Sequence, residues 1–177
     1  MKTPTPASVR RAALALLGAC LPAVAGAAPC LVGTWEPIGN AAAEWMQKNA
    51  PGARLAIDRQ QAAISFRADG TYATDAAVDA TVSSAAGGSA RTRGTRFQAS
   101  GTWSTEGDTL VMKPSRESVR GDMEVAGPNG ARIRVPLPSG APQVQRLQYS
   151  CAGAGMETRM AIPNATPIVQ RYRRKDA

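Results

Sequence analysis

The chain lacks histidine altogether and is poor in aromatic residues, which make up 5% of its 177 residues. Without histidine, the most common general base and the most common metal ligand are both missing. No cysteine cluster has the spacing of a zinc site, and no P-loop, dinucleotide-binding fingerprint or Gly-x-Ser-x-Gly motif occurs. These absences predict a protein that is not an enzyme, that uses no cofactor and that has no metal site.

Long apolar stretches are also scarce, and the one candidate lies within residues 1–27. This segment has the parts of a signal peptide: a positively charged start, an apolar stretch, and small residues at Ala25-Gly26-Ala27 that suit cleavage. The apolar stretch is shorter than the ~18 residues of a membrane span, and Pro22 interrupts it. We therefore expect a signal peptide at residues 1–27, a single domain at residues 28–177, no transmembrane span, and a periplasmic or secreted location.

A second interpretation of the leader stays open. The sequence Leu17-Gly18-Ala19-Cys20 is similar to a bacterial lipobox, in which Cys20 would be lipidated and become the mature N-terminus. The apolar region before Cys20 is short, and apolar residues continue after it, which favours simple secretion. A lipoprotein anchored through Cys20 remains the alternative.

Only three cysteines occur in the chain, and two of them, Cys30 and Cys151, lie outside the leader. Exported compartments are oxidising, so an even pair of cysteines indicates a disulfide. Such a bridge would tie the first strand to a strand near the end of the chain. Two separate thiols are the alternative.

Positive charge exceeds negative charge, with 21 Lys and Arg against 13 Asp and Glu. This balance favours an anionic envelope component as a partner, although ordinary solubility explains it more simply. Export, and the lack of a basic helix or of a surface with interleaved aromatic and basic residues, argue against nucleic acid. The oligomeric state is not indicated by the sequence.

The rest of the chain consists of short segments in which apolar and polar residues alternate, separated by turn residues. After a first strand at residues 31–36, Asn40 is typical of a helix N-cap, and residues 41–49 form the only predicted helix. The residues 83–90 predict a flexible, Gly-rich loop. Short hairpin connections favour a mainly β fold, an antiparallel up-and-down barrel of about eight to ten strands; a sandwich fits the same alternation.

Gly-Thr-aromatic occurs three times where a turn leads into a strand: Gly33-Thr34-Trp35, Gly70-Thr71-Tyr72 and Gly101-Thr102-Trp103. With the basic final strand around Tyr172, the first triplet resembles the lipocalins and the wider calycin superfamily, as a small exported bacterial β-barrel domain. The resemblance implies that Trp35 packs at the closed end of the barrel, beneath Arg171 or Arg173 of the last strand. The early helix is closer to the fatty-acid-binding branch, in which helices cover the barrel mouth.

The barrel interior predicts the function, which is non-catalytic binding of an apolar or amphiphilic small molecule. The candidate ligand-binding residues are Tyr72, Phe97, Met123 and Met160 inside the barrel, with Trp45 and Met46 of the helix over its mouth. The same side chains would also serve to fill a packed core. The alternative function is a protein-binding or hydrolase-inhibitor module of the periplasm that uses the Gly-rich loop and the arginines after it, Arg91, Arg93 and Arg96.

Overall fold

A computed structural model describes residues 29–138 and 140–175, so the predicted signal peptide and Cys20 lie outside the described residues. The helix is α1 (Ala41–Asn49), and the strands are β1 (Gly33–Ile38), β2 (Ala53–Phe66), β3 (Thr71–Ser84), β4 (Ser89–Glu106), β5 (Thr109–Ala126), β6 (Arg132–Pro136), β7 (Gln145–Ala152), β8 (Gly155–Met160) and β9 (Ile168–Arg174). Turn residues at positive φ join several of them; Gly70 and Gly107, for example, have φ of 79° and 62°.

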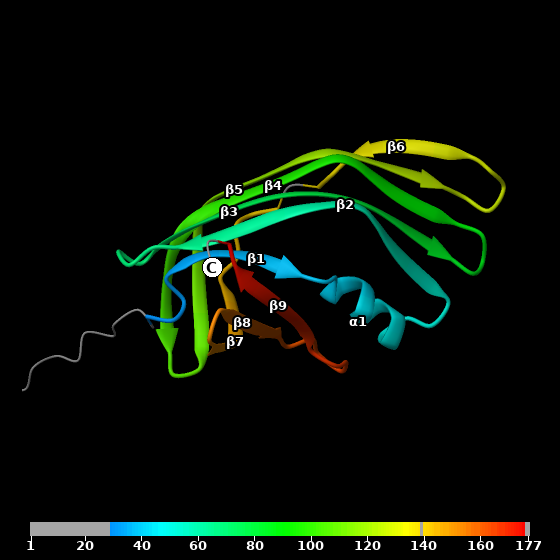
Figure 1. Cartoon of the computed structure of the whole chain (residues 1–177). Helices are drawn as coiled ribbons and strands as arrows, with labels where there is room; N and C mark the ends of the chain where they lie inside the picture. Colours follow the sequence, from blue (N-terminus) through cyan, green and yellow to red (C-terminus); the bar gives the residue numbers. More distant parts are fainter. Residues whose placement is uncertain (1–28, 139, 176–177) are drawn as a thin grey trace, which may run out of the picture.

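Eight of these strands close into a ring in the order β1-β2-β3-β4-β5-β7-β8-β9, and β9 pairs back onto β1. All of the pairings are antiparallel. The prediction of a mainly β, antiparallel barrel with one short helix after the first strand is therefore confirmed (Figure 1). Strand β6 stands outside the ring, because it pairs only with the far part of β5.

The strands β2 to β5 are long, and they continue past one end of the barrel as an arched sheet (Figure 1). β1 pairs with β2 only at Gly33–Trp35, and β5 pairs with β7 only at Thr109–Met112, so the long strands leave the ring beyond these points. We name this part the sheet extension; it comprises residues 53–62, 76–84, 89–97, 119–126 and 132–136. The sheet extension projects from the mouth of the barrel.

The helix α1 begins and ends where the sequence predicted. The Asn40 side chain caps it by accepting a hydrogen bond from the backbone N–H of Ala43 at 2.9 Å. The indole N–H of Trp45 donates to the carbonyl of Thr166 at 2.7 Å, and the Asn49 amide donates to the Thr166 hydroxyl at 2.8 Å. The helix is thus attached to the segment before β9.

The predicted loop at residues 83–90 is shorter than expected, because both strands run into it and only residues 85–88 lie between them. β3 continues to Ser84 and β4 begins at Ser89, which leaves a tight hairpin. The backbone N–H of Ser84 donates to the Gly88 carbonyl at 2.9 Å, and Gly87 has a φ of 91°. Backbone pairing across the hairpin therefore holds small residues that carry little strand preference of their own.

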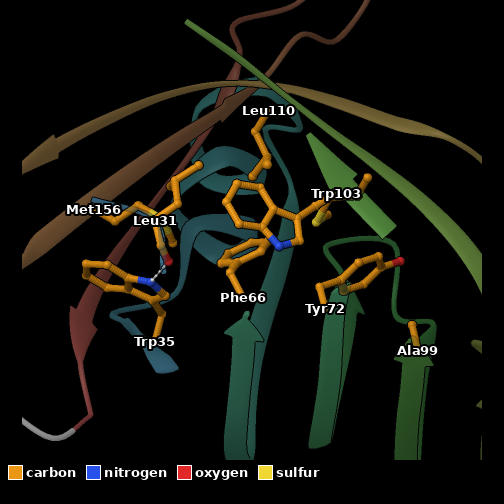
Figure 2. Close-up of a cluster of buried hydrophobic side chains, with 9 residues drawn as sticks. Leu31, Trp35, Phe66, Tyr72, Ala99, Trp103, Leu110 and Met156 are labelled. Atoms are coloured by element: carbon orange, nitrogen blue, oxygen red, sulfur yellow. Dashed lines mark hydrogen bonds between the residues drawn. The ribbon is translucent and has the colours of Figure 1, made fainter. Parts of the chain in front are cut away.

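Apolar side chains fill the other end of the barrel, which we name the closed end. The buried cluster consists of Leu31, Trp35, Phe66, Tyr72, Ala99, Trp103, Leu110, Met112 and Met156. Phe66 and Trp103 meet edge to face with centroids 5.3 Å apart, at the centre of Figure 2. The Trp103 N–H donates to the Arg67 carbonyl at 3.1 Å, so its polar edge is also satisfied. The closed end is a packed core.

Candidate ligand-binding cavity

The closed end is organised around the buried ring of Trp35. Its indole N–H donates to the Leu31 carbonyl at 2.8 Å (Figure 2). The guanidinium of Arg174 lies 4.6 Å from the ring centroid and donates to the Val32 carbonyl at 2.7 Å. Gly33 has a φ of 140°, a backbone conformation that residues with a side chain rarely adopt, so the first Gly-Thr-aromatic triplet favours its glycine. Cation–π attraction and charged hydrogen bonding thus close the barrel together.

The prediction that Arg171 or Arg173 would cover Trp35 is wrong. In the register between β1 and β9, Trp35 lies directly opposite Arg174. Residues directly opposite each other on antiparallel strands share a face, so Arg174 lies inside while Arg171 and Arg173 lie outside. Each of the two outer arginines forms an ion pair at 3.3 Å with a glutamate of a neighbouring strand. The error is a shift of one position along β9.

The predicted disulfide between Cys30 and Cys151 is confirmed, with Cα atoms 6.2 Å apart. It joins the segment before β1 to the end of β7, beside the Arg174 guanidinium, which also donates to the Cys30 carbonyl at 3.1 Å. The bridge therefore reinforces the same closed end of the barrel. A disulfide fits an oxidising compartment.

Above the closed end, the barrel interior holds a cavity of about 290 Å³. Its lining side chains are mostly apolar and come from every strand of the ring; they include Ile64, Phe66, Tyr72, Phe97, Ala99, Leu110, Met112, Leu147, Met156 and Tyr172. Side-chain amides of Gln60, Gln145 and Gln170 also line it. An apolar interior with a few polar groups is the usual composition of a small-molecule site.

Two of the six predicted ligand-binding residues, Tyr72 and Phe97, line the cavity. The other four do not. Trp45 and Met46 lie on α1, which contacts β2 and β9 beside the mouth, and Trp45 is held by Thr166. Met123 lies on the sheet extension, beyond the cavity, and Met160 is 41% exposed at the end of β8. The sequence pattern correctly assigned all six residues to strands or to the helix. It does not indicate how far along the barrel axis a residue lies.

The sequence analysis missed Glu117, which is the only charged side chain among the described residues that line the cavity. Its inward position results from a β-bulge in β5. Gly101 lies opposite Pro114, and Ser100 lies opposite Arg116, so Ser115 is an extra residue. Beyond the bulge, the side chains that point into the barrel are those at odd instead of even positions, so Glu117 lies opposite the buried Ala99. Pro114, which interrupts the alternating residues of β5, is the signal that could have found the bulge.

Glu117 affects the electrostatics of the cavity. Burial raises the pKa of the Tyr72 hydroxyl, and the negative charge of Glu117 raises it further. Burial also raises the pKa of Tyr172, although hydrogen bonding with Thr158 offsets part of this increase. Both phenols therefore stay protonated at neutral pH, and each keeps an O–H group that can donate a hydrogen bond, which Tyr172 shares with Thr158.

The inner face of the sheet extension continues the cavity lining outward. Phe97 and Val119 lie opposite each other at the mouth. Further out, one row of directly opposed residues crosses all five strands; it consists of Leu55, Val82, Ala90, Val125 and Ile133. These side chains are partly exposed, and Ile133 is 61% exposed. An apolar surface therefore leads from the mouth of the barrel along the arch.

The outer face of the same strands carries charges, and most of them are paired. Arg91 pairs with Asp58 at 3.1 Å, and Arg96 pairs with Asp75 at 2.6 Å. The Arg96 hydrogen bond holds the pKa of Asp75 below its ordinary value. A wide depression of about 1190 Å³ on this side is lined by such paired groups, including Arg96 and Asp75, and has the character of a solvated surface rather than a ligand site.

No helix in the described part of the chain is long and apolar enough to cross a membrane. Comparison with protein-family models, with curated proteins and with solved structures finds no match for this chain.

Proposed function

We propose that this chain is a non-catalytic, lipocalin-like binding protein of the cell envelope that holds an apolar or amphiphilic small molecule in its barrel. The observation that carries the proposal is the cavity of about 290 Å³ above the closed end. Its lining is apolar except for a few polar groups, and it opens toward the apolar inner face of the sheet extension. An alkyl chain would gain roughly 0.8 kcal/mol for each buried methylene in such surroundings.

The proposed location, the periplasm or the extracellular medium, is supported by the signal-like residues 1–27 and by the Cys30–Cys151 disulfide. Anchoring through Cys20 is the alternative, and mass spectrometry of the mature N-terminus distinguishes the two.

The alternative function, an inhibitor or protein-binding module that uses the arginines after the β3–β4 hairpin, has less support. Two of those arginines, Arg91 and Arg96, are engaged by aspartates of this chain.

The test fills the cavity with a side chain. Ala62 lines the cavity, whereas Ala77 on the neighbouring strand faces outward, next to Arg96 in the register. We expect the variant Ala62→Phe to reduce binding of the neutral fluorescent probe N-phenyl-1-naphthylamine at least tenfold, while Ala77→Phe leaves it unchanged. Native mass spectrometry of protein purified from the envelope would show a bound small molecule that Ala62→Phe lacks. Equal probe binding by the two folded variants would contradict a ligand site in the barrel.

A further inference from the structure

The cavity has a negative charge and no positive one. Glu117 is its only charged lining residue among those that the structure describes, and the remaining polar groups are amides, hydroxyls and phenols. Within the described part of the chain, neither a salt bridge nor a side-chain hydrogen bond involves Glu117. A half-buried carboxylate in apolar surroundings is unfavourable unless a cation or a hydrogen-bond donor meets it.

The arginines of β5 do not supply that cation. Because of the bulge at Ser115, Arg116 and Arg120 lie on the outer face, opposite Ser100 and Arg96 of β4. Arg174 lies at the closed end, where it is engaged by Trp35 and by the Val32 carbonyl. Among the described residues, Glu117 therefore lines the cavity without an ion-pair partner.

We propose that the barrel selects amphiphiles with an ammonium head, which Glu117 binds while the alkyl chain lies against the apolar lining. This inference rests on the proposed function and names the class of ligand. An ammonium placed at the carboxylate forms a charge-assisted hydrogen bond. A carboxylate or phosphate head at the same position would meet a like charge with no cation to compensate it.

The phenol hydroxyls are consistent with this selection. Tyr72 and Glu117 line the same cavity, and Tyr72 lies one inward position from Thr74 along β3, so a small polar region exists beside an otherwise apolar surface. A phenol can accept as well as donate a hydrogen bond, so it can serve a second N–H of a primary ammonium. Ligand charge, rather than chain length, is then the property that this region distinguishes.

The experiment compares decylamine, decanol and decanoate, which share one alkyl chain, as displacers of N-phenyl-1-naphthylamine at neutral pH. Charge-assisted hydrogen bonds correspond to a preference of roughly 10- to 100-fold, so we expect decylamine to bind at least tenfold more tightly than decanol, and decanoate most weakly. The variant Glu117→Gln, which keeps the size of the side chain, should abolish the preference. Glu124→Gln is the matched control, because Glu124 lies on the outer face of the same strand and pairs with Arg132.

The outcomes separate the two proposals. If the probe binds but the three amphiphiles displace it equally, or if Glu117→Gln and Glu124→Gln behave alike, the inference is overturned and the binding function stands. If neither the probe nor any amphiphile binds to the folded wild-type protein, the binding function itself fails. Should Glu117→Gln not fold, the ranking of the three amphiphiles on the wild-type protein still decides the question.

Discussion

Removal of the Arg174 side chain should destabilise the barrel far more than removal of Arg173, its neighbour on β9. Arg174 stacks on Trp35 at 4.6 Å and donates to the Val32 carbonyl at 2.7 Å. A cation–π contact contributes about 0.5–2 kcal/mol, and a hydrogen bond from a charged group about 1.5–3 kcal/mol. We therefore expect Arg174→Ala to lower the free energy of unfolding by roughly 2–5 kcal/mol.

The control uses the same residue type on the same strand. Arg173 forms an ion pair with Glu36, but its side chain is 70% exposed. Such surface pairs contribute about 0–1 kcal/mol, so Arg173→Ala should have little effect. Arg174→Lys should fall between the two, because an ammonium keeps the charge over the ring but lacks the planar fork that reaches two carbonyls.

The assay is equilibrium unfolding in urea with the disulfide intact, followed by the fluorescence of the buried tryptophans. For a domain of this size, 1 kcal/mol corresponds to a melting shift of about 2–4 °C, so thermal unfolding gives an independent measure. If Arg174→Ala and Arg173→Ala agree within about 0.5 kcal/mol, the register of β9 on β1 and the closing contact with Trp35 are both refuted.

Three further predictions concern other parts of the barrel. Replacing Cys30 and Cys151 together by serine opens a loop with a sequence separation of 121 and should cost about 2–5 kcal/mol of unfolding free energy, measured in urea against the oxidised protein. Burial raises the pKa of Tyr172 above its ordinary 10.0, so the folded state holds the phenol proton more tightly than the unfolded state does. The stability that this group contributes is present below pH 10 and is lost as the pH rises through the pKa of the folded state. Tyr172→Phe should therefore reduce the loss of thermal stability at alkaline pH. A Cβ at Gly101 would collide with the Lys113 carbonyl and lie 2.7 Å from the Pro114 Cα, so Gly101→Ala should lower the free energy of unfolding by about 1–3 kcal/mol. A Cβ at Gly140 would lie in open space, so Gly140→Ala should change that free energy by no more than about 0.5 kcal/mol. Equal effects of the two variants would contradict the close approach of the strands at Gly101.

Local chemistry made much of the fold predictable from the sequence. Asn40 has a side chain that caps a helix, and the Pro51-Gly52 sequence ends one, so α1 could be placed to the residue. Alternating apolar residues separated by turns predicted antiparallel strands with short connections. The disulfide followed from an even number of cysteines outside residues 1–27. Each of these signals lies within a few residues of the feature that it predicts, or in a simple count.

Register was not predictable, because it depends on which residue of a distant strand lies opposite. A shift of one position moves every side chain of a strand to the other face, which is why Arg171 or Arg173 was predicted to cover Trp35 where Arg174 does so. The length of pairing is also non-local: nothing in the sequence of β5 indicates that it leaves β7 after Met112 and continues beside β6. Met123 was therefore assigned to the barrel interior, although it lies on the sheet extension.

The third Gly-Thr-aromatic triplet, seen at first only as a strand start, lies beside the bulge that turns Glu117 into the cavity. Gly101 allows the backbone of Lys113 and Pro114 to approach closely, and Pro114 suits a bulge because it has no N–H to donate to the ladder. If Ser115 paired with Ser100 instead of bulging out, the inward position opposite Ala99 would belong to Arg116 instead of Glu117, and the side chain there would be positively charged. The bulge thus determines the sign of the charge on this part of the cavity lining, and the proposed preference for a cationic head depends on it.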